Sequence, residues 1–335
     1  MYSFLLLSSL SGIIELGSVY LGIYLGLSIP EAISLPLFYQ LGNLMLNYVP
    51  HKKQCCIASS IIVIVLSILC SAEYQYVVLA AQLVLSSYCI QVCRVAQKKS
   101  CPVWLKRAFR VGGFAVSPVM LIANGQAVLL ISMGYCFVLS MKSANVPLQT
   151  QDKECKKLSL VMIFHQLHYF VYTYIMPVYV IQLTKSYLLS GLAFAVTWIV
   201  YLMPQTIADN MKIKKYGLMF FVCHSFLAVC MGMMAYASML KWPAAVLVFW
   251  LLTGLGGGSV FCIKHLSSHY SQINMDLSEN IGHVAGPAIA VLLCHCFPDN
   301  EIFYLSAASC IFVVSALLSA FGLKMKGAKN EHQVC

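Results

Sequence analysis

Apolar residues gather in long runs along the whole chain, and short polar segments separate these runs. Most runs have about 20 residues, the length that an α-helix needs to cross the hydrocarbon core of a bilayer. They do not alternate with period two as the strands of a membrane barrel do, and a helix satisfies its own backbone hydrogen bonds in lipid. The pattern predicts an all-α membrane protein with about twelve transmembrane helices. The predicted spans are residues 3–27, 32–48, 55–71, 74–92, 108–123, 125–141, 158–183, 187–203, 216–237, 244–263, 277–297 and 302–323.

Composition supports lipid as the solvent of this chain. Hydrophobic residues make up 60% of the sequence, charged residues only 10%, and the mean hydropathy is +0.82. A soluble chain has about 25% charged residues and needs them to cover its surface. The second, sixth and eighth spans are short enough to be half-buried segments instead.

The positions of the basic residues predict the topology. Of the 21 Lys and Arg residues, all but Lys185 and Lys241 lie in the loops after even-numbered spans, near the C-terminus or, for Arg110, at the inner part of span five. Basic loops stay on the cytoplasmic side, so both chain ends are expected in the cytoplasm. The net charge of +10 is dispersed over several short segments, which argues for membrane orientation and against binding to nucleic acid.

The fifteen cysteines lie mostly inside the apolar runs, where a thiol packs as a small hydrophobic group. We therefore expect no disulfide framework. The sequence contains no nucleotide-binding motif and no catalytic signature. We expect no cofactor, no catalytic residues and no dedicated metal site.

A polar stretch divides the chain into an N-terminal half (1–141), an inter-half loop (142–157) and a C-terminal half (158–335). Similar motifs recur in both halves, which predicts an internal repeat. After spans two and eight, a polar residue and a lysine pair are separated by four residues: Asn47 with Lys52 and Lys53, and Asp209 with Lys214 and Lys215. In spans five and eleven, Gly113, Ser117 and Pro118 correspond to Gly282, Gly286 and Pro287.

These motifs resemble those of the major facilitator superfamily, over nearly the whole chain. That family has a glycine, an acid and a basic pair after spans two and eight, and Gly42 adds the glycine in the first half. It has a GxxxGP antiporter motif in span five, and here Ser117 replaces one glycine. The family has an Arg-x-x-Gln motif in span four. Here Gln82 matches its glutamine, and Leu79 stands in place of its arginine. The resemblance implies twelve helices in two halves, alternating access, export and a monomer.

Glu15 is the acid that we place in the middle of a span, and it lies on a small, polar helix face. Burial of a carboxylate in lipid is costly, and a low dielectric favours its neutral form. A proton carrier needs a group that can take up a proton near neutral pH. The alternative is a structural glutamate that is hydrogen-bonded to a neighbouring helix. The face of Glu15 carries Ser8, Ser11, Gly12, Ser18 and Gly22.

Span 158–183 is the expected repeat partner of the first span. His165, His168, Tyr169 and Tyr172 share one of its faces, and His168 is expected near the depth of Glu15. Imidazoles exchange protons near neutral pH, and tyrosines offer rings and hydroxyls to an organic substrate. We predict proton coupling by Glu15, His165 and His168, and substrate binding by Ser11, Ser18, Tyr169, Tyr172, Asn280 and His283.

Other residues in the spans have structural interpretations at this stage. Arg110 could attract an anionic substrate or extend its guanidinium to the lipid headgroups, and we favour the headgroups. His224 is expected to have a structural role in a peripheral span. The glycine run 256–258 is expected to mark close packing or a hinge.

The sequence predicts a secondary active transporter that exports a small organic molecule in exchange for protons, located in the plasma membrane or a bacterial inner membrane. One alternative keeps transport but changes the cargo to a transition-metal ion or chelate bound by Glu15, His165, His168 and His283. Another is a receptor or a membrane-embedded enzyme. An enzyme would need clustered catalytic groups near the headgroups, whereas the Glu and His residues lie near mid-span.

Overall fold

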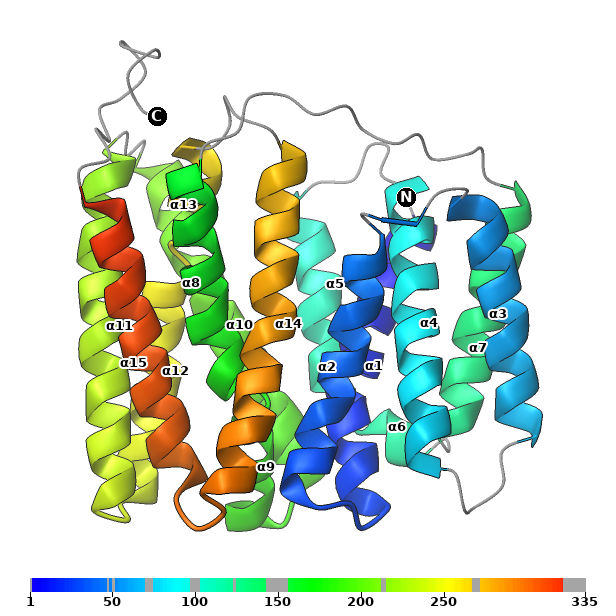
Figure 1. Cartoon of the computed structure of the whole chain (residues 1–335), viewed down its shortest axis with the longest axis horizontal. Helices are drawn as coiled ribbons and strands as arrows, with labels where there is room; N and C mark the ends of the chain where they lie inside the picture. The colour runs from blue at the N-terminus through cyan, green and yellow to red at the C-terminus, as the bar shows by residue number, and fades with distance from the viewer. Residues whose placement is uncertain are drawn as a thin grey trace. The chain divides into compact units, whose positions relative to one another are not determined.

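Every regular element that the structure describes is an α-helix, which confirms the predicted all-α class (Figure 1). The computed structural model describes residues 2–46, 48–49, 52–69, 75–96, 103–122, 125–142, 156–211, 215–266 and 272–321. Within these ranges the helices are α1 (Tyr2–Tyr24), α2 (Ile29–Met45), α3 (Lys52–Leu69), α4 (Gln75–Ala96), α5 (Val103–Ala115), α6 (Val119–Ile122), α7 (Gly125–Lys142), α8 (Lys156–Thr173), α9 (Ile175–Thr184), α10 (Tyr187–Asn210), α11 (Tyr216–Met239), α12 (Pro243–Gly257), α13 (Val260–Leu266), α14 (Gln272–Cys296) and α15 (Glu301–Ala320).

In the part of the chain that the structure describes, nine helical segments are long and apolar enough to cross a membrane. They include α1, α4, α11 and α15, and the joined pair α12–α13. Side chains that would be hidden in a soluble protein are exposed on their outer faces, for example Ile68, Leu292 and Leu318. The chain is therefore an integral, multi-pass membrane protein.

Three of the predicted spans are each divided into two helices. The span 108–123 is interrupted before Pro118, and the span 158–183 is interrupted at Tyr174, three residues before Pro177. A proline has no N–H for the preceding helical turn and its ring clashes with that turn. The third interruption, after α12, follows the glycine run, where Ser259 N–H bonds the Gly256 carbonyl at 3.1 Å in a tighter turn. The eighth span is longer than predicted, because α10 continues to Asn210.

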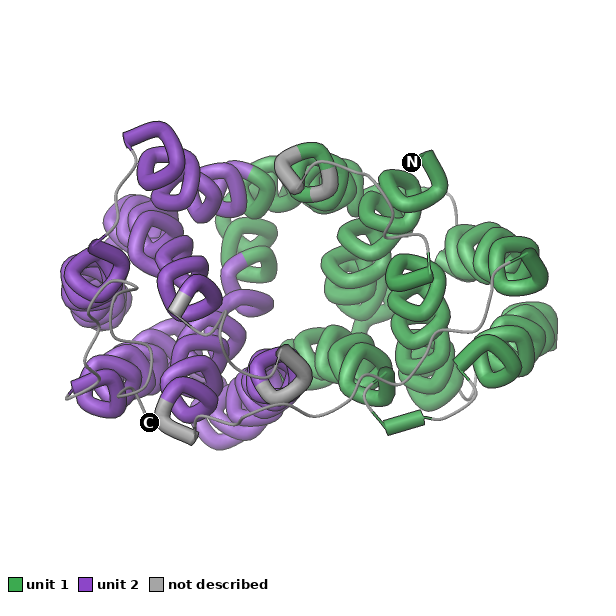
Figure 2. Tube along the Cα trace, turned by 90° about the horizontal axis from the view of Figure 1, so that it is seen from above, with its two compact units in different colours: residues 1–149, 177–195 green, residues 150–176, 196–335 purple. Residues whose placement is uncertain are grey.

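The chain forms two compact units, which Figure 2 shows in different colours. The first contains residues 1–149 and 177–195, and the second contains residues 150–176 and 196–335. The predicted boundaries differ, since residues 177–195 were placed in the C-terminal half. Residues 177–195 pack within the first unit: Tyr20 donates its hydroxyl to Ser190 at 3.0 Å, and Phe114 meets Phe194 at 5.0 Å between ring centroids.

The first unit is organised around α1. This helix packs against α5, α2 and α4. In its most apolar 18-residue segment 78% of the residues are buried, whereas the corresponding share for α3 is 22%. In the second unit α8 packs against α14 and α15, while α11 packs against α15 and α12. The contact of α1 with α5 therefore has the same place in its unit as the contact of α8 with α14. The internal repeat stays a prediction, and these pairings agree with it.

Small residues bring the backbones together at both contacts. A methyl group added to Gly12 would lie 2.6 Å from the Arg110 carbonyl oxygen, and one added to Gly113 would overlap the Ser9 carbonyl oxygen. In the second unit, a methyl group on Gly286 would lie 2.6 Å from Phe170 Cβ. A side chain at any of these positions would force the helices apart. The GxxxGP motifs thus lie where the two central helices of each unit meet.

The matched prolines act differently. Pro118 follows the end of α5, and the chain continues through Val116–Pro118 with hydrogen bonds that span three residues, such as Val119 N–H to the Val116 carbonyl at 3.0 Å. Pro287 lies inside α14, which is continuous from Gln272 to Cys296. Gly42 lies within α2, and a methyl group there would lie 2.8 Å from Ser87 Cβ on α4.

The described cysteines are all free, in agreement with the expectation of no disulfide framework. A group of them is buried where α3, α4 and α7 meet. Cys56 Sγ lies 3.0 Å from Ser140 Oγ, and Cys89 Sγ donates to the Cys56 carbonyl at 3.4 Å. These thiols fill space between helices and bond weakly to neighbouring polar groups.

Gly113→Ala is expected to lower the free energy of unfolding by about 1–3 kcal/mol, the usual cost of overfilling a packed contact. The physical cause is the overlap with the Ser9 carbonyl on α1. Gly112→Ala is the matched control, because a methyl group there meets nothing within 4 Å. Thermal unfolding of both variants in detergent measures the difference. Equal melting temperatures would contradict this account of the motif.

Candidate functional site in the first unit and buried histidines in the second

Glu15 lies in the middle of α1, and its side chain is 2% exposed. A carboxylate buried to this extent needs a compensating charge and hydrogen bonds, since its desolvation costs several kcal/mol. The structure supplies both from neighbouring helices.

Arg110 on α5 is the charged partner. Its Nη2 donates to Glu15 Oε2 at 2.7 Å, and the arginine side chain is 25% exposed. The guanidinium also lies over the Phe114 ring, 5.6 Å from its centroid. The prediction that Arg110 extends to the lipid headgroups is therefore wrong, because its charge is directed to the buried acid.

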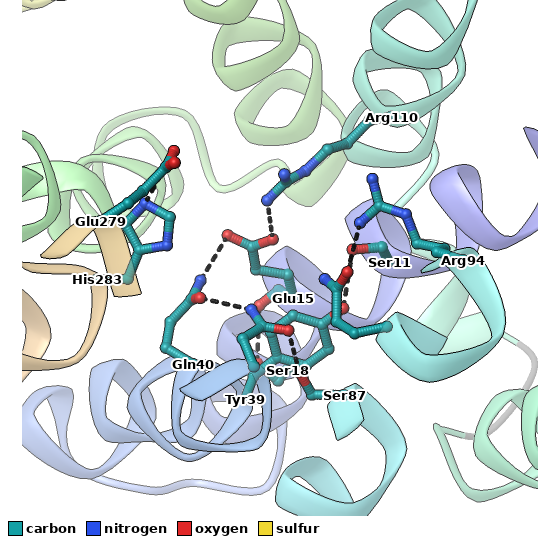
Figure 3. A network of polar contacts seen from close by, with 12 residues as sticks. Ser11, Glu15, Ser18, Tyr39, Gln40, Ser87, Arg94, Arg110, Glu279 and His283 are labelled. Atoms are coloured by element: carbon teal, nitrogen blue, oxygen red, sulfur yellow. Dashed lines mark hydrogen bonds and ion pairs between the residues drawn. The ribbon is translucent and has the colours of Figure 1, made fainter. Parts of the chain in front are cut away.

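A line of amides continues from the carboxylate across α2 to α4 (Figure 3). Gln40 Nε2 donates to Glu15 Oε1 at 3.1 Å, and Asn43 Nδ2 donates to Gln40 Oε1 at 2.7 Å. Ser87 Oγ then donates to Asn43 Oδ1 at 2.6 Å. Every donor in this line points in the direction of Glu15, so the local hydrogen bonds stabilise negative charge there.

The predicted serines of α1 are buried beside this line, with their hydroxyls already bonded. Ser18 Oγ donates to the Glu15 carbonyl oxygen at 2.8 Å, one turn back along the helix. Ser11 Oγ lies 2.8 Å from the Tyr39 hydroxyl on α2. Both serines are fully buried. In this conformation they contribute to the packing of α1, and a role in substrate binding stays a prediction.

In the second unit, His165 and His168 are fully buried on α8, with ring centroids 4.8 Å apart. His165 Nδ1 lies 2.8 Å from His224 Nε2 on α11. The other ring nitrogen of His224 lies 3.0 Å from the Phe220 carbonyl oxygen and 3.1 Å from Ser259 Oγ. His224 is therefore part of a histidine chain rather than an isolated structural residue.

His168 differs from the other two histidines, since neither of its ring nitrogens has a hydrogen-bond partner among the described residues. Its Nε2 is directed toward Gly257, where an added methyl group would lie 3.9 Å away. The same glycine run brings Gly256 against Leu227 of α11 and Gly258 against Pro204 of α10. The three glycines thus permit close packing on three sides of α12.

Tyr169 lies within a group of aromatic rings. Its centroid is 5.4 Å from Tyr201 and 6.0 Å from Trp198, both half-exposed on α10. Tyr172 is fully buried, and its hydroxyl lies 3.0 Å from Thr253 Oγ1. Because Thr253 donates its own proton to the Trp250 carbonyl, Tyr172 is the donor in this contact. Tyr172 therefore bonds α8 to α12.

A second acid lies on α14, three residues before the packing glycine Gly282. Glu279 Oε2 is 2.7 Å from Lys264 Nζ on α13, and Gln166 Nε2 donates to Glu279 Oε1 at 3.4 Å. His283 Nε2 lies 3.9 Å from Glu279 Oε1 (Figure 3), and its ring packs on Phe170 at 4.3 Å between centroids. Asn280 and His283 are half-buried.

The predicted gating residues lie partly outside the described residues, which exclude Asn47 and Lys214. Lys52 and Lys53 are the first two residues of α3, and Asp209 is exposed in the last turn of α10. Lys215 is exposed immediately before α11.

Metal binding receives no support from a ligand cluster in the part of the chain that the structure describes. No three His, Cys, Asp or Glu side chains within it come together in a way that could hold an ion. The histidines and Glu279 form hydrogen bonds and an ion pair instead.

Solved structures with the same architecture are transporters. The D-xylose-proton symporter aligns with a TM-score of 0.62, 11% identity, and coverage of 98% of this chain and 99% of that one. The inward-facing bacterial homologue of the iron transporter ferroportin aligns with a TM-score of 0.68, 13% identity, and coverage of 96% and 97%. The chain has the major facilitator fold. The human organic anion transporter MFSD10 aligns with a TM-score of 0.59, 10% identity, and coverage of 94% and 97%.

Sequence comparison adds nothing to this structural likeness. No protein-family profile matches the chain, and no curated protein matches it. The expected likeness to the major facilitator superfamily is thus confirmed by the fold. Six of the matching solved structures have 10–13% identity to this chain, and at this level the likeness establishes the fold alone.

Sequence reasoning missed several polar residues that the fold brings together. Gln40 and Asn43 are three residues apart on α2, a spacing that places them on one helix face. Arg110 and Glu279 both precede a packing glycine by three residues, so the repeat could have indicated them as a matched pair of charges. His224 was missed because a peripheral span was not expected to supply a partner for α8.

Arg110→Met is expected to lower the free energy of unfolding by about 2–3 kcal/mol, because it leaves Glu15 buried without its cation. The double variant Arg110→Met/Glu15→Leu is expected to recover most of that loss, since neither charge remains. Chemical unfolding in detergent micelles measures both. A double variant that is less stable than the single one would mean that the ion pair does not govern this site.

Proposed function

We propose that the chain is a secondary active transporter that exports a small organic molecule in exchange for protons by alternating access. The fold supports transport as the general function, because alternating access around a central site is how this architecture moves its substrates. The solved structures with this fold are named for D-xylose, nucleosides, iron and organic anions. The cargo therefore has to be inferred from the residues of this chain.

The buried pair of Glu15 and Arg110 is the observation that carries the proposal. A proton that binds Glu15 Oε2 removes the negative charge and ends the ion pair at 2.7 Å. While Glu15 is ionised, a polar or cationic group of the cargo can donate to the same carboxylate beside the Arg110 guanidinium, which is one quarter exposed. Protonation of Glu15 removes this acceptor and releases that group. Proton and cargo thus compete for Glu15, as exchange in opposite directions requires.

Other predicted residues have supporting roles in this proposal. The half-exposed rings of Trp198 and Tyr201, with Tyr169 beside them, offer stacking surfaces for an aromatic or amphipathic molecule. Ser11, Ser18, Tyr172, Asn280 and His283 become contacts when the helices move. The lysine pairs, Asn47 and Asp209 act at the cytoplasmic loops, and the GxxxGP motifs keep the central helices close while the units move.

Export as the direction rests on the antiporter-like motif of Gly113, Ser117 and Pro118. We place the protein in the plasma membrane or a bacterial inner membrane, with both chain ends in the cytoplasm, and we propose that it works as a monomer. Protons, the cargo and lipid are its partners in this scheme.

Glu15→Gln is expected to abolish net transport, because an amide cannot bind and release the proton. Cells that express the wild type should accumulate one or more compounds in the medium, and untargeted mass spectrometry of medium and extract should detect them. Glu31→Gln is the matched control. It makes the same chemical change at an exposed acid, whose pKa is lowered by hydrogen bonds from Ser28 at the start of α2.

The comparison of the two variants decides the proposal. Transport that is lost in Glu15→Gln and kept in Glu31→Gln supports proton coupling at Glu15. If Glu15→Gln moves the same compound as fast as the wild type, Glu15 has a structural role and the coupling mechanism is wrong. The side on which the compound accumulates gives the direction.

A further inference from the structure

The hydrogen bonds around His224 determine where its proton lies. A carbonyl oxygen can only accept, so the ring nitrogen 3.0 Å from the Phe220 carbonyl, Nδ1, must carry a hydrogen. Ser259 Oγ donates its own hydrogen to the Gly256 carbonyl at 2.6 Å and therefore also accepts from His224 Nδ1. In a neutral imidazole the other nitrogen, Nε2, is then a bare acceptor.

This assignment fixes the state of His165 as well. His224 Nε2 can only accept, and it lies 2.8 Å from His165 Nδ1, so His165 must donate from Nδ1. Neutral His165 is left with an unprotonated Nε2. That nitrogen is buried, and no hydrogen-bond donor among the described residues reaches it. The hydrogen bonds from His165 to His224 and from His224 to the Phe220 carbonyl thus all donate in one direction. At the other end of this chain lies the lone pair of His165 Nε2.

We propose that His165 and His224 form a proton-binding site in which the proton adds to His165 Nε2 and His224 is the positioning residue. No bond has to break when the proton enters, because the lone pair is free. The imidazolium that results keeps its Nδ1–H bond to His224, which becomes charge-assisted and stronger. The Phe220 carbonyl and Ser259 hydroxyl polarise His224 and increase its ability to accept.

His168 is the neighbouring base, but its surroundings cannot stabilise a cation in the same way. Neither of its ring nitrogens pairs with a second histidine as His165 Nδ1 does with His224, so a cation on His168 would lack the charge-assisted bond that His165 gains. Its edge-on contact with His165, at 4.8 Å between centroids, makes it a group that can receive the proton from His165 after a small rotation. The structure therefore orders the two histidines, with His165 as the holding site.

The charged groups around this site come from several helices. On α8 itself the titratable neighbour is His168, and on α11 it is His224. Lys264 of α13 pairs with Glu279 of α14 at 2.7 Å, and His283 follows on α14. The described part of α15 carries its one acid, Glu301, at its first residue, at the opposite end from Ala320. The charge of Lys264 is thus balanced by Glu279, and the local net charge does not prevent His165 from binding a proton.

The inference deepens the proposed proton coupling and can be tested without any cargo. Protein labelled with ¹⁵N at histidine, purified in detergent, gives ring-nitrogen NMR signals that distinguish protonated from bare nitrogens. At neutral pH, His165 and His224 should each be protonated at Nδ1 and bare at Nε2, with a coupling across the bond between them. His165→Gln and His224→Gln variants identify the signals.

On acidification, His165 should become protonated at both nitrogens before His168 or His224 does. In His224→Leu the doubly protonated fraction of His165 at the same acid pH should fall about tenfold or more, the effect of losing one hydrogen bond to a charged group. His224→Gln should restore much of it, because the amide oxygen can accept from His165 Nδ1.

Three results would overturn the inference: a wild-type His165 protonated at Nε2 at neutral pH, His168 titrating first, or an unchanged fraction in a folded His224→Leu protein. The wild-type spectrum decides the first two even if a variant does not fold. Transport assays of Glu15→Gln are independent of these spectra. A protein that binds the proton at His165 but moves no compound would refute the transport proposal and leave this site intact.

Discussion

The cost of a charge in a low-dielectric interior governs the organisation of the first unit. Glu15 is tolerated in the middle of α1 because Arg110 approaches it to 2.7 Å and three polar side chains direct their donors toward it. The approach of Arg110 depends on the close contact of α1 with α5, which needs Gly12 and Gly113. Helix packing and electrostatics are therefore linked at this contact. A bulkier residue would increase the helix separation and weaken the ion pair at once.

The second unit meets the same constraint in another way. Here His165 of α8 and His224 of α11 form a directed chain of hydrogen bonds instead of an ion pair. Its acid, Glu279, lies near the start of α14 where Lys264 is half-exposed, so less desolvation has to be compensated. The matched positions three residues before the packing glycines thus carry a cation in one unit and an anion in the other.

Much of the fold could be predicted from the sequence, because lipid imposes a simple rule on it. Apolar runs of span length have to be helices, and the runs 3–27, 216–237 and 302–323 correspond closely to α1, α11 and α15. The interruption at Tyr174 was not predicted, because a local break leaves the hydropathy of the run unchanged. The break after Gly257 lies in the glycine run that was expected to mark close packing or a hinge. The packing role of Gly42 was not predicted either, because it depends on the approach of α4.

The candidate site was harder to predict, because its contacts join residues that are far apart in sequence. Glu15 stood out as an acid in an apolar run. Its partner Arg110 is 95 residues away in sequence and was predicted to contact lipid headgroups instead. His165 and His168 stood out by their spacing, whereas His224 acquires its role only when α11 packs beside α8. Periodicity along one helix identifies a polar face. It does not identify the side chain that a second helix presents to that face.

The two matched prolines give the central helices different stiffness. α14 passes through Pro287 as one rod of 25 residues, so a displacement at one end is carried to the other. α5 stops before Pro118 and resumes only as the single turn α6, so the same displacement would be taken up at the joint. Arg110 lies on the long side of that joint and Gly17 of α1 packs against Ser117 within it. Of these two matched helices, α5 thus has a joint and α14 is a continuous rod, and bending of α5 is concentrated near the ion pair.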